Sequence, residues 1–565
     1  MTELGRIIND YFNNIFSSVH SNENFLFHCV PRKLDEFHNV ELLRPIRGEE
    51  VKAAIFSMYP DKAPGPDGMS PRFFQHFWDV VGPDFIKFCA DAFQSGKLPN
   101  SINHTNIVLI PKKDSPESLG DWRPITLCNV TYKIFSKVLV NRMKDVLYLF
   151  ISETQSAFIP GRSIIDNIML AFESQHYLKR KTRGKMGFVS LKLDMSKAYD
   201  RVEWTFLEGM MRHLGFAEMW INLIMECVTS VTYSIPFDES ELGPIFPTRG
   251  LRQGDPLSPY LFLIVAEGLS ALLRHSEETG RLHGVAVARG APQISHLLFA
   301  DDSLLFFKAT HGEASLVKEI LHDYEMASGQ MINLNKSRIF FSPNVPNEHQ
   351  VGLIEMLGVG LAGEEERYLG LPAMVGRSKR KILDYLRQRI VNRIQSWNNQ
   401  FLSRAGREVL LKSVVQAMPN YAMNVFLFPK DLCREMEVLM NAFWWMGQSG
   451  KGIKWRSWDF SCKPKKLGGM GFKKIRDFNL SMLAKQAWRL FTEPETLVAR
   501  VFKTRYYPKG TFLTAKIGHN PSFIWYSIFQ TQGIIKDSYY WRVGNGESIN
   551  VWSEPWLPDG INPKV

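Results

Sequence analysis

Two apolar runs flank a pair of acidic residues in the segment HLLFADDSLLFF, residues 296–307. Short apolar runs bounded by a turn are typical of buried strands, so this pattern predicts a hairpin with Asp301 and Asp302 at its tip. A second run, GFVSLKLD at residues 187–194, predicts a strand that ends at Asp194, just before a helix. The pattern therefore places three carboxylates at the ends of strands.

The remaining pattern is mostly helical, with turn-rich segments between the periodic stretches. We predict helices at about 1–58, 73–94 and 129–150, a strand at 102–113, a loop at 114–127, and a loop followed by a buried helix at 250–273. From about residue 373 the pattern is mainly helical, and the Trp-rich segment 543–560 is typical of short strands and turns. The order strand, helix, helix, hairpin is that of a split βαβ unit.

The three carboxylates require a compensating charge, because burying a carboxylate without a partner costs several kcal/mol. A set of oxygen ligands alone favours a hard divalent ion, Mg²⁺ or Mn²⁺. Strand side chains alternate between faces, so only one of the two adjacent acids can point fully toward Asp194. We take Asp301 as the stronger ligand and Asp302 as auxiliary. The alternative interpretation of an Asp-Asp pair is an ordinary turn.

Composition narrows the class of protein. The chain has 565 residues, 45% of them hydrophobic, which is enough for several domains with sizeable cores. There is neither a signal-peptide pattern at the start nor an apolar run near the roughly 20 residues of a membrane span. The six cysteines lie far apart, which excludes a CxxC zinc knuckle and a dense disulfide framework. We therefore expect a soluble intracellular protein with reduced thiols.

The net charge of +11 is concentrated in the C-terminal half. Residues 377–412 hold ten Lys and Arg against two acids, and residues 451–490 hold eleven against two. These windows carry +17 together, which leaves the rest of the chain near −6. Trp residues are interleaved with them, and basic plus aromatic surface suits nucleic acid. The alternative is that these cations only solvate amphipathic helices.

Nine segments carry a resemblance to a known family. In chain order they are KAPGPDGMS, IPKK, DWRPITLCNVTYKI, QSAFIPGRSIIDNI, LKLDMSKAYDRVEW, GLRQGDPLSPYLF, FADD, SGQMINLNKSRI and YLGLPA. Together they resemble the successive sequence blocks of reverse transcriptases from non-LTR (LINE-type) retrotransposons, the plant lineage especially. The resemblance is strong over about 61–373, and two segments beyond it also resemble the region behind that domain in such elements.

The resemblance implies an α+β fold of the right-hand polymerase type, with fingers, a split βαβ palm, a helical thumb and a mainly helical C-terminal extension. It suggests four regions: an N-terminal helical linker (1–60), reverse transcriptase fingers and palm (61–372), a helical thumb (373–450), and a basic Trp-rich C-terminal region (451–565). Within the second region, the fingers would run from about 61 to 185.

The resemblance also implies an activity, RNA-directed DNA synthesis. In this reaction two divalent ions about 4 Å apart activate the primer 3′-hydroxyl and neutralise the leaving pyrophosphate. Asp194, Asp301 and Asp302 match the family's metal ligands, and Mg²⁺ is the implied cofactor, with Mn²⁺ possible. Lys336 matches a position proposed to donate a proton to pyrophosphate; an exposed solvating lysine is the competing interpretation.

Further positions match nucleotide and template contacts. Tyr199 matches the residue whose ring crowds the sugar 2′-position, although a buried core tyrosine is the alternative. The other implied contacts to the incoming nucleotide are Lys112 or Lys113, Arg123, Arg252, Gln253 and Gly254. The implied template and primer contacts are Phe158, Gly161, Arg162 and the turn Tyr368, Leu369, Gly370 and Leu371.

The expected partners are an RNA template, a DNA primer and dNTPs, without a membrane. Nuclear residence is implied by the family alone. Complete elements of this type also carry an endonuclease and often a Cys/His-rich or ribonuclease H segment; we find neither here, and interpret the chain as a polymerase portion incapable of autonomous transposition. Two other classes stay open: an inactive relic or maturase-like RNA-binding protein, and a DNA-templated polymerase.

Overall fold

The computed structural model divides the chain into two compact units. One unit comprises residues 1–164, 181–285 and 294–362, and the other comprises 165–180, 286–293 and 363–565. The structure describes residues 3–18, 26–99, 101–238, 240–363, 366–372, 378–397, 402–446, 452–545, 552 and 555–556. Most of the predicted Trp-rich strands and turns at 543–560 lie outside these residues. The four regions suggested by the sequence stay a prediction.

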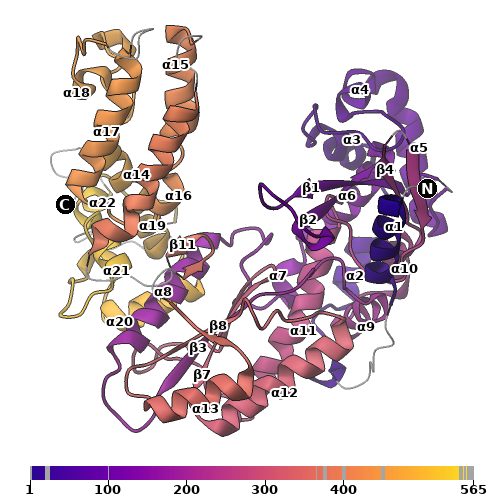
Figure 1. The fold of residues 1–565 in the computed structure, drawn as a ribbon, viewed down its shortest axis with the longest axis horizontal. Coiled ribbons are helices and arrows are strands. Elements are labelled where there is room, and N and C mark those ends of the chain that lie inside the picture. Colours follow the sequence, from indigo (N-terminus) through magenta and orange to yellow (C-terminus); the bar gives the residue numbers. More distant parts are fainter. Residues whose placement is uncertain are drawn as a thin grey trace. The chain divides into compact units, whose positions relative to one another are not determined.

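A five-stranded sheet of order β6-β7-β3-β8-β9 lies at the centre of the first unit. Its strands are β6 (His296–Phe299), β7 (Asp302–Lys308), β3 (Phe188–Leu193), β8 (Arg338–Phe341) and β9 (Gly360–Leu361). Figure 1 labels β3, β7 and β8. Strand β3 pairs antiparallel with β7, and Leu193 opposes Ser303. The predicted hairpin and the predicted strand before Asp194 are therefore confirmed, and the register brings Asp194 to the hairpin turn.

Three helices of the first unit pack together and share its main apolar core with this sheet. They are α9 (Trp204–Leu214), α11 (Ser258–Glu278) and α12 (His311–Ser328). Helix α11 is apolar on nearly all sides and has Pro259 in its first turn, which suits a buried helix. The prediction of a loop followed by a buried helix at 250–273 is confirmed.

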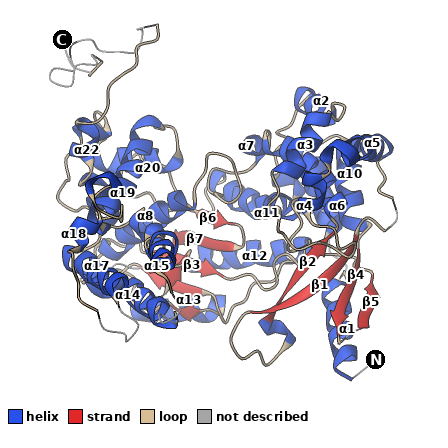
Figure 2. Cartoon of the chain, turned by 90° about the horizontal axis from the view of Figure 1, so that it is seen from above, coloured by secondary structure: helices blue, strands red, loops and turns tan. Residues whose placement is uncertain are grey.

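A second sheet has the order β2-β1-β4-β5. Its strands are β2 (Trp122–Cys128), β1 (His104–Pro111), β4 (Thr232–Phe237) and β5 (Ser240–Ile245) (Figure 2). The prediction of a loop over all of 114–127 was wrong, because β2 occupies its second half. Pro124 made that half look unlike a strand, but β2 is an edge strand, where a missing N–H removes no necessary ladder hydrogen bond.

The N-terminal helix α1 (Glu3–Phe16) covers part of this second sheet. Its buried face, Ile8, Phe12 and Phe16, joins Ile107 and Tyr233 in an apolar cluster separate from the main core. The rings of Phe16 and Tyr233 lie 5.1 Å apart. Figure 2 shows α1 beside β4 and β5. The beginning of the chain is thus part of the folded unit that contains both sheets.

The other elements are mainly helical. The first unit also contains α2 (Glu36–Leu43), α3 (Gly48–Phe56), α4 (Pro71–His76), α5 (Trp78–Ser95), α6 (Val130–Lys144), α7 (Leu147–Phe150), α10 (Glu218–Thr229), α13 (Asn347–Leu357) and a 3₁₀ turn η2 (Phe27–Cys29). The second unit contains α14 (Lys379–Ser396), α15 (Arg404–Leu410), α16 (Asn420–Met423), α17 (Lys430–Trp445), α18 (Trp458–Ser461), α19 (Ile475–Thr492), α20 (Leu497–Tyr506), α21 (Phe523–Phe529), α22 (Gln532–Lys536) and the short hairpin β10 (Arg367–Tyr368) and β11 (Leu371–Pro372). Throughout the described residues, every helix is too short or too polar to cross a membrane.

Helix α8 (Ile164–Arg180) belongs, from residue 165, to the second unit. Glu173 is fully buried there, its carboxylate 3.0 Å from Arg505 Nε and accepting a hydrogen bond of 2.6 Å from the Tyr506 hydroxyl. Burial raises the pKa of Glu173, and the nearby Arg505 cation opposes that rise. A segment from the first third of the chain is therefore held by partners more than 300 residues further on.

Candidate active site

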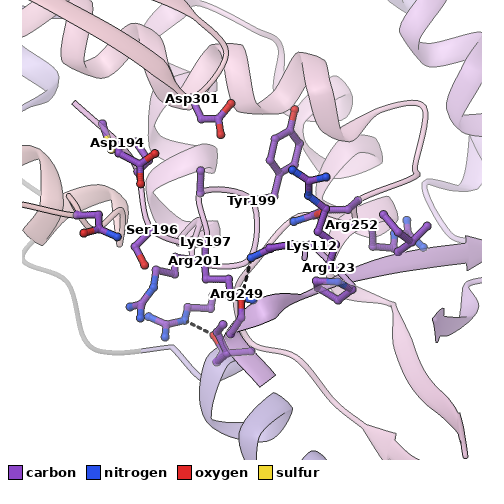
Figure 3. Close-up of a pocket in the computed structure, with 18 of the residues that line it drawn as sticks. Lys112, Arg123, Asp194, Ser196, Lys197, Tyr199, Arg201, Arg249, Arg252 and Asp301 are labelled. Atoms are coloured by element: carbon purple, nitrogen blue, oxygen red, sulfur yellow. Dashed lines mark hydrogen bonds between the residues drawn. The ribbon is translucent and has the colours of Figure 1, made fainter. Parts of the chain in front are cut away.

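A cavity of about 1030 Å³ lies in the first unit and is lined by residues of β2 in the second sheet and by residues directly after β3 and directly before β7 (Figure 3). The predicted site residues that line it are Lys112, Arg123, Asp194, Tyr199, Arg252, Gln253, Gly254, Asp301 and Lys336. The structure therefore brings together acids, cations and an aromatic ring that are up to 224 positions apart in the sequence. Asp302, Lys113 and the predicted template and primer contacts do not line it.

Two of the three acids, Asp194 and Asp301, face the cavity. Figure 3 shows their carboxylates at the same end of it. Burial raises the pKa of Asp301, and the negative charge of Asp194 raises it further. Asp302 is the first residue of β7 and its pKa is also raised by burial and by Asp301. The carboxylate oxygens of the three residues are not all within 4.8 Å of one another.

One cation beside the acids was missed in the sequence. Lys192 stands two residues before Asp194 on β3 and is therefore on the same face of the sheet. Its charge lowers the pKa of Asp302, against the effects of burial and of Asp301. The period-2 alternation of the strand could have identified this neighbour. Part of the compensating charge that the acids require is thus supplied by the protein itself.

The backbone around each acid is fixed by hydrogen bonds from other segments. The hairpin turn has Ala300 at φ +53°, and Ala300 N donates to Oε1 of the buried Gln155 at 3.2 Å. Asp194 N donates to Ser337 Oγ at 3.3 Å, and Asp194 O accepts from Asn333 N at 2.7 Å. Because these partners lie outside the two strands, the carboxylates are presented by a backbone held from both sides.

The opposite wall of the cavity is cationic. Lys112 lines it and donates from Nζ to Gly120 O at 2.9 Å, whereas Lys113 Nζ is paired with Asp121 at 3.1 Å. The pKa of Lys112 is lowered first by burial and then by the charges of Lys197 and Arg123. Of the two lysines that the sequence left open, Lys112 is the one placed at the cavity.

Three further cations that line the cavity were not predicted: Arg249, which is paired with Glu203 at 3.2 Å, and two residues close to Tyr199 in the sequence. Lys197 and Arg201 line the cavity, and Lys197 Nζ donates to Trp122 O at 3.3 Å. Both belong to the segment KAYDR, whose tyrosine the sequence did single out. The sequence could have predicted both residues, because residues a few positions after an acid at the end of a strand stay near that acid in space. Tyr11 and Asn14 of α1 also line the cavity, and nothing in the local sequence indicated this.

The side chain of Tyr199 lines the cavity and also packs against the protein core. Its ring stacks on Phe262 of α11, with ring centroids 4.9 Å apart and planes 12° apart. Burial, followed by the charge of Asp301, raises the pKa of its hydroxyl, so the phenol stays neutral at physiological pH. A ring held in this way is a rigid wall rather than a mobile side chain.

The segment RQGDP docks on strand β2. Gln253 O accepts hydrogen bonds from Thr126 N at 2.9 Å and from Thr126 Oγ1 at 3.1 Å. Gly254 adopts φ +134°, and a Cβ there would lie 2.6 Å from Thr126 O. Only glycine allows this approach. The cavity floor at Gln253 and Gly254 is therefore fixed to the second sheet.

The side chain of Arg252 has several partners within the protein. It lines the cavity, but its guanidinium is buried and paired with Asp255 at 2.7 Å. It also donates to Cys227 O at 3.0 Å and lies over the Tyr132 ring at 4.1 Å. In the structure, the guanidinium that we expected to contact a nucleotide is bound by these partners. The contact with a nucleotide stays a prediction.

The predicted template and primer contacts lie elsewhere. Phe158 is exposed and has φ +58°, and Gly161 has φ +80°. The Arg162 guanidinium donates hydrogen bonds to Gln155 O at 2.7 Å and to Ile151 O at 3.0 Å, so it stabilises the loop that contains it. The turn from Tyr368 to Leu371 forms the β10-β11 hairpin of the second unit, where Tyr421 Oη donates to Leu369 O at 2.8 Å.

Asp200 is a buried acid beside the cavity that the sequence did not single out. It is 2% exposed, and the Gln253 amide donates to its Oδ1 at 3.4 Å. Burial raises its pKa to about 6, although the charges of Lys197 and Lys112 oppose this. Its charge in turn raises the pKa of Tyr11. Asp200 thus links α1, the cationic wall and the RQGDP segment electrostatically.

The change Asp200→Asn is expected to stabilise the fold at neutral pH. A carboxyl with a raised folded-state pKa stabilises the fold only while it is protonated, so the wild-type free energy of unfolding should fall as pH rises from 3.8 to about 6. A shift of this size corresponds to about 3 kcal/mol. Urea unfolding at several pH values should show this slope in the wild type and lose it in Asp200→Asn. Identical pH profiles would mean that Asp200 ionises normally.

Comparisons with known proteins indicate the family of this chain. A family model for reverse transcriptase (RNA-dependent DNA polymerase) matches residues 110–373. An uncharacterized 149 kDa protein of transposon TX1 from Xenopus laevis is 29% identical over 455 residues, which are 78% of this chain and 33% of that protein. The retrovirus-related Pol polyprotein of the retrotransposable element R2 from Popillia japonica is 28% identical over 263 residues, 46% of this chain and 35% of the polyprotein.

A third relative is shorter. An uncharacterized mitochondrial protein of Arabidopsis thaliana is 34% identical over 145 residues, which are 25% of this chain and 94% of that protein. The chain spans about a third of the length of the transposon TX1 and R2 proteins that it matches.

Proposed function

Because the chain belongs to the reverse transcriptase family, and within it to the proteins of non-LTR retrotransposons, we propose that it extends a DNA primer on an RNA template with dNTPs. The observation that carries this proposal is a single cavity with Asp194 and Asp301 at one end and a wall of Lys112, Arg123 and Lys197. Nucleotidyl transfer requires both, since charge develops on the transferred phosphoryl group and on the pyrophosphate that leaves.

The acids fit the metal that this reaction requires. Carboxylate oxygens are the ligands that Mg²⁺ and Mn²⁺ prefer. The pKa values of Asp301 and Asp302 are raised first by burial and then by neighbouring negative charge, and a divalent ion would offset both effects. We propose Asp194 and Asp301 as ligands and Asp302 as an auxiliary one. Bound there, Mg²⁺ would supply Lewis-acid chemistry, activating the primer hydroxyl and stabilising the leaving group in a two-metal arrangement.

The other lining residues have proposed roles in binding. Lys112, Arg123 and Lys197 would hold the triphosphate, because clustered cations neutralise its charge in a partly desolvated cavity. Gln253 and Gly254 would pack against the nucleotide. Lys336, which is exposed at the cavity, would donate a proton to pyrophosphate.

The basic region of the second unit is proposed to bind the nucleic acid, with its helices acting as thumb and extension. Aromatic rings there are paired with cations: Lys473 Nζ lies 3.7 Å from the Phe478 ring centroid, and the Arg456 guanidinium lies 4.6 Å from that of Phe460. Such pairs can stack bases and contact phosphates. Residence in the nucleus is part of this proposal only through the family's use of chromosomal DNA as primer.

The proposal is tested by primer extension with the purified chain, an RNA template, an annealed DNA primer, dNTPs and Mg²⁺. We expect the primer to be lengthened and the product to be lost when Mg²⁺ is chelated. A folded protein that binds the primer and template with high affinity and extends nothing would instead be an inactive RNA-binding relic. Extension on DNA alone would indicate a DNA-templated polymerase.

Tyr199 is expected to exclude ribonucleotides, because its ring is clamped against Phe262 and cannot move away from a 2′-hydroxyl. Tyr199→Ala should therefore raise the ribonucleotide-to-deoxyribonucleotide ratio of kcat/KM by roughly 10–200-fold, the range for a small steric difference in a pocket. Single-nucleotide incorporation with matched rNTP and dNTP measures this ratio. Tyr199→Phe keeps the ring and should keep the preference. An unchanged ratio in Tyr199→Ala would remove the role.

A further inference from the structure

Three metal-type donors converge in the first unit, outside the residues that line the cavity. They are His28 and Cys29 in η2 and His275 near the end of α11. One ligand atom from each lies within 4.8 Å of the other two, and the sulfur of Cys29 is 3.1 Å from Nε2 of His28. Within the described residues, no other group of three His, Cys, Asp or Glu side chains has its ligand atoms within 4.8 Å of one another.

The segment that carries two of the donors is anchored by the residue before them. The ring of Phe27 is parallel to that of His213 at 4.5 Å and stacks on Phe206 of α9 at 5.7 Å. Gly209 makes room for it, because a Cβ there would lie 2.3 Å from Phe27. Helix α9 packs in turn on α11, which carries the third donor, His275. The donors are therefore held close together by the apolar core and not by their own mutual contacts alone.

The sulfur of Cys29 is available to a metal ion. All six cysteines of the chain are free, so this sulfur is not engaged in a disulfide. The side chain is half-buried, and its sulfur lies within 4.8 Å of one nitrogen from each of two imidazoles. One sulfur and two imidazole nitrogens at this spacing form a set of donors that is typical of metal ligands.

We propose that His28, Cys29 and His275 bind one Zn²⁺ ion with three protein ligands and leave the fourth position to water. Two imidazole nitrogens and one thiolate form a borderline-soft donor set of the kind that Zn²⁺ prefers over Mg²⁺ and Mn²⁺. The thiol would release its proton to the solvent as the metal binds, so affinity should rise with pH. The acids of the cavity, which offer oxygen alone, would not compete for this ion.

The position of the cluster indicates a structural role. Pro259 lines the cavity and His275 lies sixteen residues further along the same helix, which corresponds to about 24 Å of helix. At that distance the ion could not take part in nucleotide chemistry. It would instead connect a segment within the first thirty residues to the end of α11, and its binding energy would contribute to the stability of the fold.

The experiment uses the purified full-length chain, stripped with a chelator and then titrated with Zn²⁺ and, separately, with Co²⁺. We expect one tightly bound Zn²⁺ per chain by elemental analysis and a thiolate-to-Co²⁺ charge-transfer band in the near ultraviolet. Cys29→Ser should abolish the band. His275→Ala should weaken Zn²⁺ binding by more than the roughly 10–100-fold that loss of an indirect partner costs. Zn²⁺ should raise the thermal unfolding temperature of the wild type, and this rise should be lost in Cys29→Ser and His275→Ala.

Matched controls come from the same chain. Cys462→Ser removes another half-buried thiol, His76→Ala removes another exposed imidazole, and Asp301→Asn alters the cavity; all three should bind Zn²⁺ as the wild type does. If Cys29→Ser fails to fold, the wild-type Co²⁺ spectrum alone decides. A spectrum without thiolate charge transfer, or Zn²⁺ binding lost only in Asp301→Asn, would overturn the site whether or not the chain proves to be a polymerase.

Discussion

Asp301→Asn is expected to reduce primer extension by at least ~1,000-fold, which corresponds to about 4 kcal/mol of transition-state stabilisation. Asp301 shares the cavity with Asp194 and has a pKa raised by burial and by that neighbour. The amide keeps the shape of the side chain but removes the negative charge that a divalent ion requires. Affinity for the primer and template should change little, because phosphate contacts dominate it.

Single-turnover extension at saturating Mg²⁺, together with fluorescence anisotropy of a labelled primer and template, separates these two quantities. Asp323→Asn is the matched control: Asp323 is another acid with a raised pKa, but it lies on α12 and does not line the cavity. That variant should extend normally. If Asp301→Asn kept most of its activity, the assignment of metal ligands would have to be abandoned.

Arg252→Met is expected to lower the free energy of unfolding of the first unit by about 3–5 kcal/mol, the usual cost of removing one partner of a buried ion pair. The methionine would fill part of the volume but would leave Asp255, which is 5% exposed, with an uncompensated charge. The cation over the Tyr132 ring and the hydrogen bond to Cys227 O would be lost as well. This network joins α6, α10 and the RQGDP segment.

Urea unfolding of four proteins tests this: wild type, Arg252→Met, Asp255→Asn and the double variant. The double variant should recover part of the loss, because no buried charge is then left unpaired. The same proteins distinguish the two interpretations of Arg252. A variant of normal stability whose KM for dNTPs is raised would place the guanidinium on the nucleotide, against the contacts described here.

Much of the first unit was predictable because its apolar residues are periodic. The runs around Asp194 and Asp301 are typical of strands, and the helix that begins after RQGDP is apolar on nearly all sides. Strand β2 could not be predicted, since Pro124 argues against a strand until the strand is known to lie at an edge. The sequence also did not predict that α1 contributes residues to the cavity. Its apolar face indicates burial but not the surface that it covers.

The residues of the candidate site were likewise predictable only where the local sequence pattern places them. Residues that sit at strand ends or within a few positions of them were found from the sequence, and Tyr199 and the acids are the clearest cases. The surroundings of Arg252 and Asp200 depend on contacts between distant segments, so the sequence did not show that one cation is internally paired or that one acid is buried. The convergence of His275 with Cys29 spans 246 positions and leaves no local signal.

The course of α8 limits how this protein can be shortened. The family match ends at residue 373, which suggests a convenient place to cut. However, Glu173 is fully buried against Arg505 and Tyr506, so a fragment that ended near 373 would expose an apolar helix and leave its acid without those partners. A shortened chain that keeps these contacts therefore has to extend at least through α20. The residues beyond 373 are thus part of the folded unit that contains α8, although they follow it by nearly 200 positions in the sequence.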